Sequence, residues 1–148
     1  MRINMSLLFG VIALLIGCDV NIVSPDELPR QFLMTAYDST TQSKYSKTIS
    51  EDDPVYRRLK TLITEEQSGW SIGFSSPPHS GPYLFESDTM HIICYQSYII
   101  IRSWGVGKKY TVEKDISDVY TRLGLPMVDI EEYVKWSRRP RTINKATP

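Results

Sequence analysis

The sequence predicts an α+β domain: an antiparallel sheet of about four strands, with an N-terminal helix and one or two C-terminal helices packed on it. Three observations support this. Apolar residues keep helical spacing between residues 52 and 69 and then change to a two-residue alternation. Short links between the later extended segments favour an antiparallel meander. Helical spacing returns after residue 115, so we expect the helices to share one sheet face.

The first residues form a segment that does not belong to this domain. Arg2 is followed by an apolar run over residues 5–17 whose only polar side chain is Ser6. A helix needs about 20 apolar residues to cross a bilayer. This run is shorter and matches the hydrophobic region of a signal peptide. We therefore expect residues 1–17 to be removed.

The end of this run, Leu15-Ile16-Gly17-Cys18, resembles the lipobox of bacterial lipoproteins. The resemblance implies that a diacylglycerol alkylates the Cys18 thiol, that cleavage separates Gly17 from Cys18, and that the new amino group is acylated. Two or more acyl chains anchor a protein stably, so Cys18 would tether the domain to the cell membrane, on the periplasmic side in a cell with two membranes. The alternative is a secretory signal with an incidental cysteine.

Asp19 follows the cysteine directly. In enteric-type bacteria an aspartate at this position resembles the signal that keeps a lipoprotein in the inner membrane. A polar start to a linker explains it equally well. We expect residues 18–30, which contain two prolines, to form a tether, residues 31–137 a single domain, and residues 138–148 a basic, flexible tail.

Charge and size limit the function classes. The chain has 17 basic and 17 acidic residues, and removing residues 1–17 from the 148 leaves 131 residues with a net charge of −1. This length is sufficient for one domain with one core. The charge balance argues against a nucleic-acid-binding protein.

The first half of the domain contains the clearest helix. Residues 31–37 are predicted to form a first strand, and 45–49 are a candidate second strand. The helix begins where Asp52 or Asp53 can cap its first turn and Pro54 suits the first helical position, and Gly69 closes it. Its apolar stripe consists of Val55, Leu59, Leu62 and Ile63.

The second half is predicted to form the sheet and the last helices. The extended segments are 70–76, 83–87, 90–96, 98–104 and 108–114. The first alternates apolar and polar residues, the two at 90–104 are apolar enough to be central, and the last resembles an edge strand. Residues 116–123 show helical spacing that ends at Gly124, and residues 127–136 show a less regular helical pattern.

No stretch carries a recognisable catalytic, metal-binding or cofactor-binding motif, so we expect no enzyme, no metal and no cofactor. A zinc site built from His79, His91, Cys94 and a carboxylate would lack a ligand pair at helical spacing. Cys94 lies inside the apolar stretch MHIICY and is therefore expected to be a small buried hydrophobic residue. Lipidation of Cys18 would leave it without a disulfide partner in the chain. The glycines at 105 and 107 fit turns better than a phosphate-binding loop.

Candidate contacts with a partner come from a loop and from aromatic residues. The proline-rich loop at 76–82 can hold an extended conformation and present its histidine, so we take Pro77, Pro78, His79 and Tyr83 as candidate partner-binding residues. Tyrosines cluster in the predicted sheet and helix, where they could form an exposed recognition face or, more commonly, a half-buried sheet. They are Tyr83, Tyr95, Tyr98, Tyr110 and Tyr120.

The function expected from these features is that of a membrane-anchored lipoprotein with a small, non-catalytic domain that binds another protein in the periplasm. One alternative is an immunity lipoprotein that neutralises a toxin acting in the periplasm. Another is a structural subunit of an envelope complex. An enzyme would require His79 or His91 to meet a carboxylate or Cys94 in a pocket.

Overall fold

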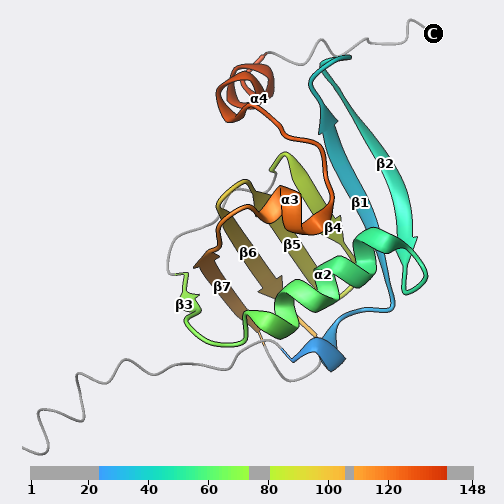
Figure 1. Cartoon of the computed structure of the whole chain (residues 1–148), viewed down its shortest axis with the longest axis vertical. Helices are drawn as coiled ribbons and strands as arrows, with labels where there is room; N and C mark the ends of the chain where they lie inside the picture. The colour runs from blue at the N-terminus through green and yellow to red at the C-terminus, as the bar shows by residue number, and fades with distance from the viewer. Residues whose placement is uncertain (1–23, 74–80, 106–108, 140–148) are drawn as a thin grey trace, which may run out of the picture.

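The computed structural model describes residues 24–73, 81–105 and 109–139. The predicted α+β class, with an antiparallel sheet and helices, is confirmed (Figure 1). In chain order the elements are the 3-10 helix η1 (Pro25–Glu27), strands β1 (Gln31–Asp38) and β2 (Ser43–Ser50), helix α2 (Pro54–Glu65), strands β3 (Ser71–Ile72), β4 (Tyr83–Glu86), β5 (Met90–Tyr95), β6 (Tyr98–Ser103) and β7 (Tyr110–Asp115), and helices α3 (Val119–Leu123) and α4 (Ile130–Ser137).

The predicted number of strands is wrong. The sheet has seven strands in the order β2-β1-β4-β5-β6-β7-β3, and every neighbouring pair is antiparallel. The expected meander corresponds to β4–β7. The β1–β2 hairpin extends this meander because β1 pairs with β4. Strand β2, helix α2 and strand β3 separate these two strands along the chain, so no local sequence pattern reveals their pairing. Of the strand expected over 70–76, the structure describes residues 70–73, and residues 71–72 form strand β3.

Helix α2 forms for the reasons that its sequence suggests. Asp53 is the N-cap, its carboxylate accepts a hydrogen bond from the Val55 N–H at 2.7 Å, and Pro54 occupies the first helical position. The helix ends at Glu65, before the predicted stop at Gly69. Of the two predicted candidates, Asp52 and Asp53, it is Asp53 that caps the helix.

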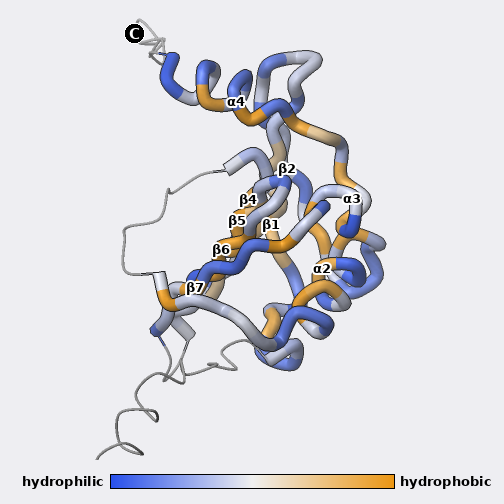
Figure 2. The backbone as a smooth tube through the Cα atoms, turned by 60° about the vertical axis from the view of Figure 1, so that its left-hand side comes forward, coloured by the Kyte–Doolittle hydropathy of each residue, from blue (hydrophilic) through white to orange (hydrophobic). Residues whose placement is uncertain are grey.

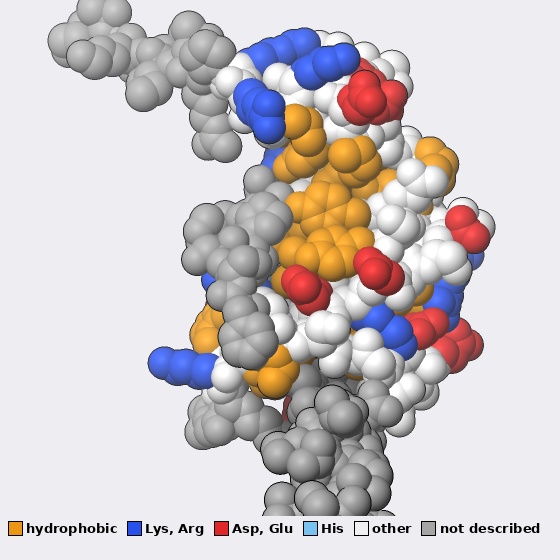
Figure 3. Space-filling view, turned by 90° about the vertical axis from the view of Figure 1, so that its left-hand side faces the viewer, with side chains coloured by type: hydrophobic (Ala, Val, Ile, Leu, Met, Phe, Trp, Pro, Cys, Tyr) orange, Lys and Arg blue, Asp and Glu red, His pale blue; other side chains and the backbone are white. Residues whose placement is uncertain are grey.

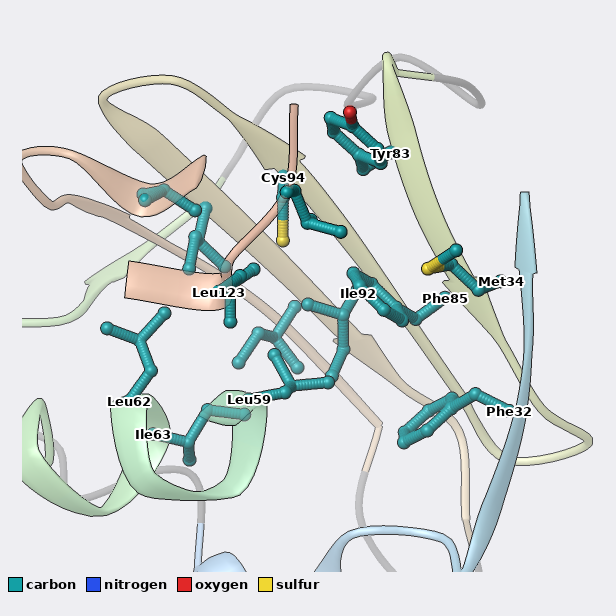
Figure 4. Packing of buried hydrophobic residues seen from close by; sticks show 14 of the residues in the cluster. Phe32, Met34, Leu59, Leu62, Ile63, Tyr83, Phe85, Ile92, Cys94 and Leu123 are labelled. Carbon is teal, nitrogen blue, oxygen red and sulfur yellow. The ribbon is translucent and has the colours of Figure 1, made fainter. Parts of the chain in front are cut away.

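The main core lies between α2, α3 and one face of the sheet. Side chains alternate between the two faces of a strand, and Phe32 and Met34 of β1 share a face with Phe85 of β4. These side chains point toward Leu59 of α2 and its neighbours (Figure 4). Leu123 of α3 completes the same cluster.

Helix α4 does not share this face. It lies at the hairpin end of the sheet, away from α2 and α3 (Figure 2). It packs on Tyr37 through Tyr133 and Trp136, with ring centroids 5.5 and 5.0 Å apart. Because Tyr37 alternates with Phe32, Met34 and Ala36 along β1, its side chain points to the opposite face. The expectation that all helices cover one face is therefore wrong for α4.

The folded domain begins before Gln31. Leu28 is only 8% exposed and belongs to the core, and the Tyr56 hydroxyl donates to the Pro29 carbonyl at 2.9 Å. Part of the predicted tether is therefore packed against the domain. Within the described ranges, no helix combines the length and apolar character that crossing a membrane requires.

Candidate binding pocket

A cavity of about 320 Å³ lies between the β1–β2 hairpin and the segment that joins α3 to α4. It is lined by Tyr37, Asp38, Ser39, Thr40, Tyr45, Tyr83, Pro126, Met127 and Val128. Ligand pockets of proteins commonly measure about 300–1,000 Å³. This cavity is at the lower end of that range, so it suits a single side chain or a small ligand.

The sheet register brings side chains from three strands to one face beside the cavity. Ala36 of β1 is opposite Tyr45 of β2 on one side and opposite Tyr83 of β4 on the other. Neighbouring strands are about 4.8 Å apart, so the two tyrosines stand about 10 Å apart on the same face. Ala36 itself is fully buried and does not line the cavity, whereas Asp38, two residues further along on that face, does.

The hairpin turn fixes the carboxylate of Asp38. The Thr40 N–H donates to Asp38 Oδ1 and the Thr41 hydroxyl donates to Asp38 Oδ2, each at 2.9 Å. These hydrogen bonds favour the charged form and lower the pKa of Asp38 from its ordinary value. The pocket therefore carries an ionised carboxylate at neutral pH.

The segment after α3 forms the facing wall. Helix α3 ends at Gly124, whose φ of 66° is the left-handed conformation that glycine adopts without strain. The Tyr83 hydroxyl then donates to the Pro126 carbonyl at 2.8 Å and holds the segment against the sheet. Val128 is buried, whereas Met127 is 56% exposed at the rim.

Helix α4 holds the hairpin from the other face. Arg139 donates to Gln42 Oε1 at 2.9 Å, and Gln42 donates to Glu132 at 3.4 Å. Lys44 Nζ lies 5.6 Å from the ring centroid of Tyr133. These contacts join the hairpin to α4, so the two walls of the pocket belong to connected elements.

A larger hollow of about 550 Å³ lies near the start of β1, lined by residues 29–33 and 86–89. Its charged lining residues have mixed signs: Arg30 against Glu86 and Asp88. Glu86 is also 3.5 Å from His91 Nε2. This hollow has no group of tyrosines comparable to that of the hairpin pocket, so the hairpin pocket is the better candidate for a specific ligand.

Of the four candidate partner-binding residues, the structure describes only Tyr83. Tyr83 is 1% exposed and packs edge-on against Tyr120 at 5.0 Å, so it belongs to the core and not to an exposed contact surface. It contributes to the pocket as a lining residue. Pro77, Pro78 and His79 lie outside the described residues, as do Gly17, Cys18 and Asp19.

Cys94 is buried, as expected, and its burial raises the pKa of the thiol. His91 and Cys94 are three residues apart in β5, so their side chains point to opposite faces of the sheet. The two cannot join in one zinc site without a change in the strand. Among the described residues, no group of three His, Cys, Asp or Glu side chains could hold a metal.

The predicted aromatic face is only partly exposed. Tyr120 is buried, whereas Tyr95 and Tyr98 are partly buried, with ring centroids 5.7 Å apart. The Tyr98 hydroxyl donates to Glu113 at 2.9 Å, and burial followed by this contact raises its pKa to about 12. Figure 3 shows a group of apolar side chains on one face of the molecule, with charged side chains above and below it.

Asp38, Tyr45 and Met127 were not predicted as site residues. They come from three segments that the β1–β2 and β1–β4 pairings and the Tyr83 hydrogen bond bring together. A local signal exists only for the hairpin, where Asp38 starts a polar turn. Comparison with protein-family models, curated proteins and solved structures finds no match for this chain.

Proposed function

We propose that this chain is a membrane-anchored bacterial lipoprotein whose domain binds another protein in the periplasm without catalysing a reaction. The anchoring part rests on the lipobox resemblance at Leu15–Cys18. The binding part rests on one observation: two large, exposed side chains, Tyr45 at 45% and Met127 at 56%, stand at the rim of the hairpin pocket. Tyrosine and methionine are enriched at protein interfaces.

The position of the pocket relative to the anchor supports a partner away from the lipid surface. Only residues 19–23 separate Cys18 from Ser24, where the described domain begins. Six chain steps span at most about 20 Å, so a lipidated Cys18 would hold η1 close to the membrane. The pocket lies at the other end of β1 (Figure 1). Eight residues of strand span about 25 Å, so the pocket would lie on the membrane-distal side.

Two measurements test this proposal. Mass spectrometry of the protein purified from its native membrane should find Cys18 as an N-terminal, lipid-modified residue. A Cys18→Ala variant should stay soluble or unprocessed. A cleaved but unlipidated N-terminus in the wild type would contradict the anchoring part.

Cross-linked capture from native membranes, with a C-terminal tag and Cys18 intact, tests the binding part. We expect one stoichiometric protein that the Cys18→Ala variant does not recover. A secreted toxin among the captured proteins would identify an immunity lipoprotein, and envelope proteins would identify a structural subunit. Recovery of nothing above the Cys18→Ala control would contradict a protein-binding function.

A further inference from the structure

We infer that the hairpin pocket binds an arginine side chain of the partner, an inference that rests on the proposed function and names the chemistry of its contact. The guanidinium group would lie against the exposed ring of Tyr45 and pair with the carboxylate of Asp38. The aliphatic part of the arginine side chain would lie along Met127 and Val128.

Charge is the first argument. Asp38 is the only charged residue among the nine that line the pocket. Its two oxygens each accept one hydrogen bond from the turn. These hydrogen bonds orient the carboxylate but come from neutral groups, so its negative charge is not neutralised. Among the described residues Asp38 forms no ion pair. A cationic ligand would provide the missing partner.

The basic side chains nearest to the hairpin are engaged elsewhere. Lys44 lies over the rings of Tyr133 and Trp136. Arg139 donates to Gln42, and Lys47 pairs with Asp53 at 3.2 Å. None of these three residues lines the pocket. The cation that complements Asp38 would therefore come from a second molecule.

The shape of the pocket favours arginine over lysine. Tyr45 and Tyr83 flank Ala36 and stand about 10 Å apart. Of the two, only Tyr45, at 45% exposed, offers an open aromatic surface to a ligand, because Tyr83 is 1% exposed. The guanidinium group is planar, stacks on aromatic faces and pairs with both oxygens of a carboxylate. The exposed thioether of Met127 is flexible enough to follow the methylene groups of the side chain.

Methyl NMR of the full chain in detergent micelles, labelled with ¹³C-methyl methionine, tests this inference. The probes are N-acetyl-arginine methylamide and the neutral citrulline analogue of nearly equal shape. We expect arginine to shift the Met127 methyl signal saturably while the buried Met34 and Met90 signals stay in place. Loss of the charge should weaken binding about tenfold, which corresponds to about 1.4 kcal/mol.

The variant Asp38→Asn should lower arginine affinity about tenfold as well, because it removes the charge. Its amide oxygen can still accept from the Thr40 N–H, so the turn is expected to persist. The matched control is Asp52→Asn, an exposed aspartate at the other end of β2, which should bind arginine like the wild type. Equal shifts with citrulline, an unchanged affinity in Asp38→Asn, or no response of Met127 would overturn the inference.

Capture from membranes separates this inference from the proposed function. If wild type and Asp38→Asn recover the same protein equally well and arginine causes no shift, the domain binds a protein but the arginine inference is wrong. If arginine shifts Met127 selectively but no protein is recovered, the pocket chemistry is correct and the proposed function fails.

Discussion

The two ends of the domain differ in how their charged side chains are paired. At the C-terminal end of α2, the carboxylate of Glu66 accepts from Arg122 at 2.6 Å and from Lys114 at 2.7 Å. Arg122 also pairs with Glu65 at 2.7 Å. At the hairpin end, the ionised Asp38 has no ion pair among the described residues.

Two buried tyrosine hydroxyl groups of the described domain also lack hydrogen bonds. Within the described part of the chain, the hydroxyls of Tyr120 and Tyr133 are buried without a hydrogen-bond partner. An unpaired buried polar group costs about 1–3 kcal/mol. Tyr133 of α4 lies at the hairpin end, where Asp38 also lacks an ion pair among the described residues, whereas Tyr120 belongs to α3 in the main core. Such groups cluster where proteins bind other molecules.

The largest expected effect lies in the core under α2. Leu59→Ala removes a side chain that is 0% exposed and should lower the free energy of unfolding by about 2–5 kcal/mol. Leu33→Ala is the matched control, because Leu33 is 46% exposed and should change stability by no more than about 0.5 kcal/mol. Urea unfolding followed by circular dichroism measures both. Similar losses of unfolding free energy in the two variants would show that the core under α2 contributes no more to stability than the exposed surface of β1.

The ion pairs at the end of α2 should have a smaller effect. Glu66→Gln leaves Arg122 and Lys114 without their shared carboxylate and should destabilise by about 1–2 kcal/mol. Glu65→Gln removes the more exposed of the two partners of Arg122 and should cost less than about 1 kcal/mol. An equal loss in both variants would mean that the second cation near Glu66 adds nothing to the free energy of unfolding.

The contribution of Glu66 should also depend on pH. Hydrogen bonds from Lys114 and Arg122 hold the pKa of Glu66 below its ordinary value in the folded state. Its stabilisation is therefore fully present above the unfolded pKa of about 4.3 and is lost as the pH falls through the lower folded pKa. The stability difference between wild type and Glu66→Gln should shrink between pH 6 and pH 3. A difference that stays constant with pH would contradict the ionic origin of the effect.

The smallest effects compare two tyrosines near the hairpin end. Tyr83→Phe removes the hydroxyl that donates to the Pro126 carbonyl and should cost about 1 kcal/mol. Tyr133→Phe removes a buried hydroxyl without a partner and should stabilise the domain by about 1 kcal/mol. Thermal unfolding of both variants measures the difference. A larger loss in Tyr133→Phe would show that its hydroxyl is satisfied in solution.

The sequence predicted the features that depend on neighbouring residues. The Asp53 cap, the Leu59 stripe and the burial of Cys94 follow from local spacing and composition. The strand count and the position of α4 did not follow, because they depend on pairing between β1 and β4 and on contacts of Tyr37 with α4. The pocket was missed for the same reason: Asp38, Tyr45 and Met127 approach one another only after the hairpin and the segment after α3 have packed.

A site-specific photo-cross-linker tests most directly whether the hairpin end is the binding surface. It would replace Met127 in one variant and Thr61, an exposed residue of α2, in another, each in the full chain with Cys18 intact and in native membranes. Our account predicts one discrete cross-linked protein from position 127 and none from position 61. Cross-linking at position 61 alone, or equal yields at both positions, would contradict it.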